Sequence, residues 1–133
     1  MEKPVKINHI ALAVSDIENS LNFWENALGL KVEETEEVDA EKVKVSFLNI
    51  GNCRLELVQS TDPESSLGKY LEKKGPGIHH ICVEVEDIDL MVKQLIVKGI
   101  NVINEKPKVK KDGKKYVFIH PESTQGVLVE LYQ

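Results

Sequence analysis

The chain repeats itself. The stretch "INHIALAVSDI" at residues 7–17 is echoed by "IHHICVEVEDI" at residues 78–88, so that His9 aligns with His80 and Asp16 with Asp87 at an offset of 71 residues (80 − 9 and 87 − 16). Self-similarity of this kind is the signature of a duplicated structural unit. A half of this size cannot bury both faces of a sheet alone. The repeat therefore predicts two similar modules that pack together within 133 residues.

Both copies predict the same order of elements. "HIALAV" and "HICVEV" alternate with a period of two, which indicates strands. Asp16 and Asp87 stand where a helix N-cap is expected, and each following helix should end at a glycine, Gly29 or Gly99. These glycines are offset by 70, so one residue has been gained or lost inside a helix. Three strands then complete each copy, giving a βαβββ module at about 5–60, a linker with a short helix at about 61–77, and a second module at about 78–133.

This order of elements predicts an α+β fold. Pairing the two modules gives a curved, eight-stranded mixed sheet in a single domain over residues 1–133, with helices on the outer face. The inner face would then line a cleft.

Four side chains are expected on that inner face. Glu56 lies between two leucines in "RLELV", and Glu130 lies between aliphatic residues in "LVELY". Because neighbouring side chains in a strand point to opposite faces, both glutamates should point away from the helices. His9 and His80 begin their strands on the face opposite the large aliphatic residues.

Two imidazoles and two carboxylates at equivalent repeat positions predict one metal site. A single histidine at a strand start is more often structural than a ligand. Here, however, the alternation of the strands places His9 and Glu56 of the first copy, and His80 and Glu130 of the second, on the same face of the sheet. Nitrogen and oxygen donors suit a divalent ion, with cobalt favoured and nickel, manganese or zinc as alternatives. Each copy would supply half of the coordination shell, which explains the repeat.

Composition narrows the class of protein. A net charge of −5 argues against nucleic acid as a partner, and no apolar run approaches the length of a membrane span. The start "MEKPVKIN" lacks the apolar core of a secretory signal. Cys53 and Cys82 lie in apolar strand patterns and are expected to be reduced and buried. A cytoplasmic enzyme domain is the expectation.

With these residues assembled, the chain resembles the vicinal oxygen chelate superfamily over nearly its whole length. Within that superfamily it resembles the methylmalonyl-CoA epimerases most, through "INHIALAV", "GIHHI" and "FIHPESTQGVLVEL". The resemblance implies a divalent-metal-dependent isomerase that interconverts the 2R and 2S epimers of methylmalonyl-CoA. A proton would leave C2 through a metal-stabilised enolate.

The same resemblance implies which residues move the proton. Some members carry a glutamine in place of Glu56 and a separate glutamate base on the preceding strand, where this chain has Val45. Since valine cannot transfer a proton, Glu56 and Glu130 are the expected acid–base pair. The fallback bases are three acidic residues before that strand: Glu37, Asp39 and Glu41.

An acyl-CoA thioester partner would need cations for its phosphates. The basic loop "KVKKDGKK" at 108–115 offers Lys114 and Lys115, and His120 could reach a ligand from the rim. A homodimer is also expected, because this architecture often pairs.

Two other functions stay open. One is lactoylglutathione lyase (glyoxalase I), which isomerises a glutathione hemithioacetal by related chemistry. The other is a metal-free module that binds small molecules or drugs, although such a protein would have no reason to keep all four donors.

Overall fold

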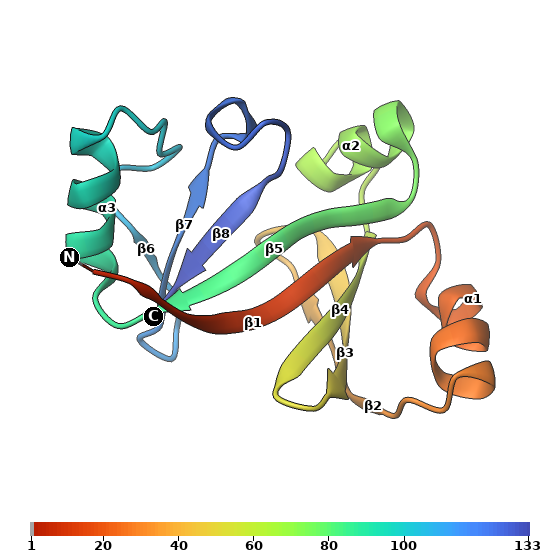
Figure 1. The fold of residues 1–133 in the computed structure, drawn as a ribbon. Helices are drawn as coiled ribbons and strands as arrows, with labels where there is room; N and C mark the ends of the chain where they lie inside the picture. Colours follow the sequence, from red (N-terminus) through yellow and green to blue (C-terminus); the bar gives the residue numbers. More distant parts are fainter. Residues whose placement is uncertain (1) are drawn as a thin grey trace. The chain divides into compact units, whose positions relative to one another are not determined.

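The computed structural model describes residues 2–133. Two βαβββ modules follow one another, and a helix connects them (Figure 1). The first module contains β1 (Pro4–Ala13), α1 (Ile17–Leu21), the π-helix η1 (Asn22–Ala27), β2 (Val32–Val38), β3 (Val43–Ile50) and β4 (Cys53–Ser60). The connecting helix is α2 (Ser66–Lys74). The second module contains β5 (Gly77–Val85), α3 (Ile88–Val97), β6 (Lys108–Val109), β7 (Lys115–Ile119), the 3-10 helix η2 (Pro121–Ser123) and β8 (Val129–Tyr132).

The eight strands form one mixed sheet in the order β2-β3-β4-β1-β5-β8-β7-β6. Strands β5 and β8 are parallel, whereas the β2/β3, β3/β4, β7/β8 and β6/β7 pairs are antiparallel. This confirms the predicted fold class. Contacts divide the chain into two compact units, one of Ile10–His79 and one that joins the chain up to His9 with His80–Gln133. We call them the Ile10–His79 unit and the His80–Gln133 unit.

The Ile10–His79 unit has its core between the first helix and the sheet. Leu48, Leu55 and Leu57 from β3 and β4 pack with Ile17 and Val14. Because Leu55 and Leu57 both enter this core, the alternation of the strand turns the residues between them to the opposite face.

The π-helix η1 accounts for the extra residue of the first helix. The backbone N–H of Leu28 donates to the carbonyl of Phe23, five residues earlier, at 2.8 Å. A π-turn accommodates one additional residue without moving the two ends of the helix, so the inserted residue is absorbed there. The helix is then followed by Gly29 at φ +92°, the left-handed conformation that the sequence predicted.

Of the two aspartate N-caps predicted for the first helix of each module, the structure contains one. The Asp87 carboxylate accepts from the backbone N–H of Leu90 at 3.0 Å, but Asp16 makes no side-chain cap. In both modules a glutamine at the end of the last strand accepts from the first helical N–H. Gln59 bonds to Ile17 at 2.8 Å and Gln133 to Ile88 at 2.7 Å. The expected side-chain cap at Asp16 was therefore wrong, and in the first module it is the bond from Ile17 to Gln59 that satisfies an N–H of the first turn.

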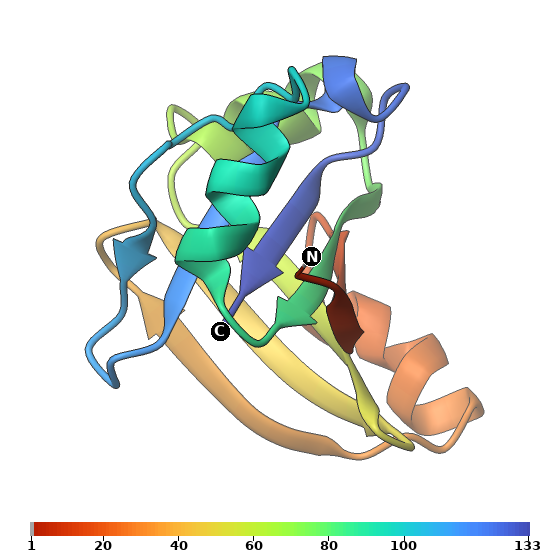
Figure 2. The same ribbon diagram turned by 60° about the vertical axis from the view of Figure 1, so that its left-hand side comes forward.

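In the His80–Gln133 unit, α3 covers one face of β5, β8 and β7 (Figure 2). The core there contains Val85, Ile88, Val92, Val117 and Leu131. No helix in the described residues 2–133 is long and apolar enough to cross a membrane.

Candidate metal centre

Glu130 lies on the face of β8 that is turned away from α3. Its neighbour Leu131 enters the core against α3, and its register partners are Cys82 on β5 and Phe118 on β7. The alternating pattern of the sequence predicted this orientation correctly. Only 5% of Glu130 is exposed, so its carboxylate needs partners inside the protein.

Those partners are the two histidines of the repeat. Oε1 of Glu130 lies 3.0 Å from Nε2 of His80 and 3.4 Å from Nε2 of His9, and the two Nε2 atoms are 3.3 Å apart. His9 is 5% exposed. The structure therefore brings three of the four predicted donors together within one unit, although they are up to 121 residues apart in sequence (130 − 9).

The spacing of these three atoms fits a divalent ion. Donors about 2.1 Å from a metal lie about 3.0 Å apart at right angles and about 3.4 Å apart at tetrahedral angles. The three observed distances, 3.0, 3.3 and 3.4 Å, fall in that interval. Two imidazole nitrogens with a carboxylate oxygen suit zinc, cobalt, nickel or manganese.

Asn8 sets the orientation of the His9 ring. Its Oδ1 lies 2.8 Å from Nδ1 of His9, while its amide nitrogen faces the Glu84 carboxylate at 3.5 Å. With this amide orientation Nδ1 donates to Asn8, so Nε2 of His9 donates a proton to Glu130 when the ring is protonated and presents a lone pair when the ring is neutral. A lone pair that faces a carboxylate oxygen is repelled unless a proton or a cation lies between them. The sequence analysis missed Asn8, although its position directly before the first histidine was visible.

The carboxylate of Glu130 is available to a cation. Burial alone would raise the pKa of Glu130, but hydrogen bonds from His80 and His9 outweigh burial and lower this pKa to about 2. The group is therefore ionised throughout the neutral range.

Cys82 adds a further donor atom to this cluster. It is fully buried, and its Sγ lies within 4.8 Å of donor atoms of His9 and Glu130. The sequence predicted that Cys53 and Cys82 are both reduced and buried; both are free thiols and Cys82 is buried as predicted, but Cys53 is only partly buried, because it lies at the start of β4 beside the turn at Gly51. Cys82 lies beside the histidines because it is the register partner of Glu130 on the neighbouring strand. The sequence did not reveal this pairing of the two strands.

Glu56 belongs to the Ile10–His79 unit. It is half-buried, and its register partner on β3 is Phe47. Because Leu55 and Leu57 enter the core of α1, the side chain of Glu56 lies on the other face of β4, as its pattern predicted. Its role as the fourth ligand stays a prediction, as does the cleft.

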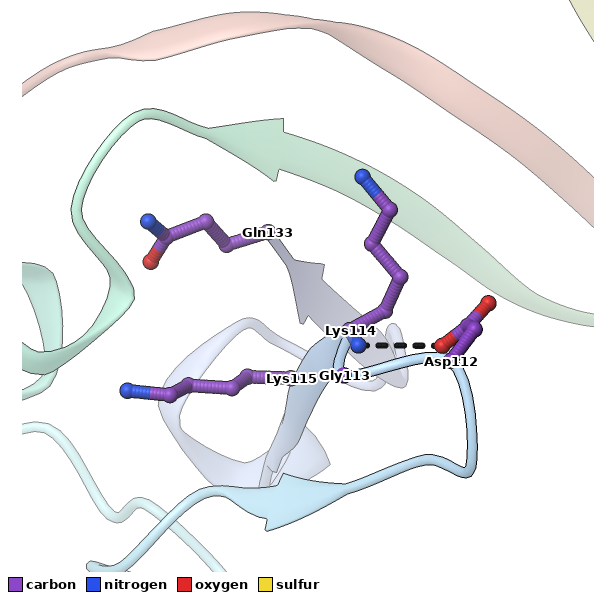
Figure 3. Close-up of a pocket in the computed structure, with 5 residues that line it drawn as sticks. All are labelled: Asp112, Gly113, Lys114, Lys115 and Gln133. Carbon is purple, nitrogen blue, oxygen red and sulfur yellow. Dashed lines mark hydrogen bonds between the residues drawn. The ribbon is translucent and has the colours of Figure 1, made fainter.

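The basic loop forms a turn at Asp112 and Gly113 between β6 and β7. A pocket there is lined by Asp112, Gly113, Lys114, Lys115 and Gln133, and the two lysine side chains point in different directions (Figure 3). The ammonium group of Lys115 is paired with Asp89 of α3 at 2.8 Å, on the face of β7 opposite Phe118. This places Lys115 away from Glu130, and its predicted contact with substrate stays a prediction, as does that of Lys114.

His120 lies at the start of η2, where its Nδ1 accepts from the backbone N–H of Glu122 at 3.1 Å. It is exposed, and its predicted ligand contact likewise stays a prediction.

Lys110 is the basic-loop residue that reaches the face carrying Glu130. Its Nζ lies 5.5 Å from the ring centre of Tyr116 and 5.1 Å from that of Tyr132. Phe118 continues this aromatic row and contacts His80 with ring centres 5.5 Å apart. The sequence analysis chose other lysines of the loop, because the fold of the turn decides which of them bends over the sheet.

A family model described as the glyoxalase/bleomycin resistance protein/dioxygenase superfamily matches residues 8–118. The chain belongs to this superfamily. The match includes His9, Glu56 and His80, and it confirms the resemblance inferred from the repeat.

Among superfamily members, the chain is similar to proteins named methylmalonyl-CoA epimerase. It is 39% identical to the mitochondrial methylmalonyl-CoA epimerase of Bos taurus, covering 96% of this chain and 74% of that protein. It is 37% identical to the ethylmalonyl-CoA/methylmalonyl-CoA epimerase of Cereibacter sphaeroides, covering 96% and 97%. A solved structure of methylmalonyl-CoA epimerase in complex with methylmalonyl-CoA and NH4+ superposes with a TM-score of 0.88 at 31% identity, covering 98% of this chain and 94% of that one.

Proposed function

We propose that this protein is a divalent-metal-dependent methylmalonyl-CoA epimerase, an isomerase that acts on an acyl-CoA thioester. The observation that carries the proposal is the buried cluster of His9, His80 and Glu130 in a chain similar to named epimerases over almost its full length. A metal-free binding module would not need two imidazoles and an ionised carboxylate in contact.

Each residue has a distinct part in the proposed reaction. His9, His80, Glu130 and Glu56 would hold the ion, which when bound supplies positive charge beside the thioester oxygen where negative charge develops. One of the carboxylates, Glu56 or Glu130, takes the C2 proton to become a carboxylic acid. The other carboxyl group must begin the cycle protonated, and it delivers that proton to the opposite face of C2. The centre is inverted, and the pair of carboxyl groups carries one proton before and after the reaction.

The test is exchange of the C2 hydrogen of methylmalonyl-CoA in D₂O, followed by NMR or mass spectrometry, with and without a chelator. We expect exchange that the chelator stops and that added Co²⁺ restores. Glu86→Gln, which changes an exposed carboxylate of the His80–Gln133 unit, is the matched control and should exchange at the wild-type rate.

The same preparation should be offered the hemithioacetal of methylglyoxal and glutathione. Turnover of that compound, with no exchange in methylmalonyl-CoA, would assign the protein to lactoylglutathione lyase chemistry instead. Exchange that persists after complete metal removal would contradict the metal-dependent part of the proposal.

Several finer points stay predictions from the sequence. These are cobalt as the favoured metal, a homodimer, a cytoplasmic location and one domain over residues 1–133. The same holds for the absence of nucleic-acid and membrane partners.

A further inference from the structure

Arg54 is the single arginine of the chain, which otherwise uses lysine for its basic side chains. It lies on β4 two residues before Glu56, so the two side chains share one face of the strand. Leu55 and Leu57 occupy the opposite face and pack in the core. Arg54 is therefore placed on the face that carries a proposed ligand, with its Cα about 7 Å from that of Glu56.

The guanidinium group is held in a defined position. Its central carbon lies 4.4 Å from the ring centre of Phe47, the register partner of Glu56. A guanidinium group over an aromatic ring gains a cation–π attraction and leaves its edge available to a planar anion. Phe47 therefore orients Arg54 on the same face as Glu56.

One donor of Arg54 is left unsatisfied. Its Nε is buried and has no hydrogen-bond partner among the described residues 2–133. Buried donors without a partner are rare in folded proteins and cost free energy, so such a group points to a ligand that completes it. Arginine offers two parallel N–H groups that match the two oxygens of a carboxylate or a phosphate.

We propose that Arg54 binds an anionic oxygen group of the substrate through its Nε and an adjacent guanidinium nitrogen, and that the side chain shifts as the ligand arrives, because Nε is closed to solvent without it. This rests on the proposed function, in which the substrate carries a free carboxylate on its malonyl part and phosphates on its coenzyme A part. Both are planar or tetrahedral oxyanions of the kind that arginine binds in a bidentate manner.

The test is a comparison of binding by calorimetry between the wild-type protein, Arg54→Gln and Arg54→Lys. The three ligands are methylmalonyl-CoA, propionyl-CoA, which lacks the carboxylate, and the N-acetylcysteamine thioester of methylmalonate, which lacks the phosphates. Lys31→Gln removes one exposed cation from the same unit and is the control for a general charge effect.

We expect Arg54→Gln to weaken methylmalonyl-CoA binding about 10- to 100-fold, as for loss of a charged hydrogen-bonded pair, and Arg54→Lys to recover only part of that loss. If the partner is the carboxylate, the loss persists with the short thioester and vanishes with propionyl-CoA. If the partner is a phosphate, the loss persists with propionyl-CoA and vanishes with the short thioester.

The proposal would be overturned if Arg54→Gln weakened the binding of all three ligands equally, because such a loss would not depend on a particular anionic group. It would also be overturned if Lys31→Gln weakened binding as much, because the loss would then be a general effect of charge. Unchanged affinity in Arg54→Gln would overturn it as well. Binding is measured without turnover, so a protein that binds these thioesters but shows no C2 exchange would refute the proposed epimerase while leaving the test of Arg54 intact.

Discussion

The sharpest test of the metal centre that does not depend on activity is the pH dependence of stability in Glu130→Gln. Burial raises the pKa of Glu130, but hydrogen bonds from His80 and His9 outweigh it and lower this pKa from 4.5 to about 2. A depressed carboxylate pKa stabilises the folded state fully above the unfolded value and loses that contribution as pH falls towards the folded value. The full difference is about 3.4 kcal/mol at about 1.36 kcal/mol per pKa unit. About 2 kcal/mol of this is lost between about pH 5 and pH 3.

Glutamine has the shape of the protonated acid and carries no charge at any pH. We therefore expect the difference in free energy of unfolding between wild type and Glu130→Gln to shrink by about 2 kcal/mol from about pH 5 to pH 3. The assay is urea unfolding followed by tryptophan fluorescence, in chelator throughout. Glu86→Gln, which alters an exposed carboxylate of the same unit, is the control. A difference that stays flat across this range would show that Glu130 does not meet His9 and His80 in the folded protein.

Three further predictions concern the same site. Saturating Co²⁺ should raise the melting temperature of chelator-treated protein, since a ligand at 100 times its Kd adds about 2.7 kcal/mol to the free energy of unfolding. In a thermal scan, His80→Ala should show no such rise in melting temperature. Cobalt-loaded Cys82→Ser should keep the absorption spectrum of the wild type if the ligands are nitrogen and oxygen, whereas loss of a near-ultraviolet band would make the thiolate a ligand. Turnover should be abolished in Glu130→Gln and largely kept in Val45→Ala; a larger loss at Val45 would contradict the assignment of Glu56 and Glu130 to proton transfer.

Much of the fold could be predicted because it depends on local geometry. The alternation in β4 and β8 placed the leucines and the glutamates on opposite faces, and Gly29 and Gly99 marked the ends of the helices. These features follow from the period of a strand and from the left-handed φ that glycine adopts without strain. The repeat then paired His9 with His80, and the structure places both against Glu130.

Other features depended on which strands meet and in which register. Gln59 and Gln133 reach helix amides, and Cys82 lies opposite Glu130, through contacts between residues that are far apart in sequence. Lys110 rather than Lys115 bends over the aromatic face because the turn at Gly113 and the ion pair with Asp89 direct the two side chains apart.

The sequence alone thus determined which residue types stand on each face, because side-chain direction within a strand follows from the backbone. Only the tertiary structure decided which of those residues touch. The distance between two side chains on different strands depends on strand order and register, and these are fixed by packing of the whole core.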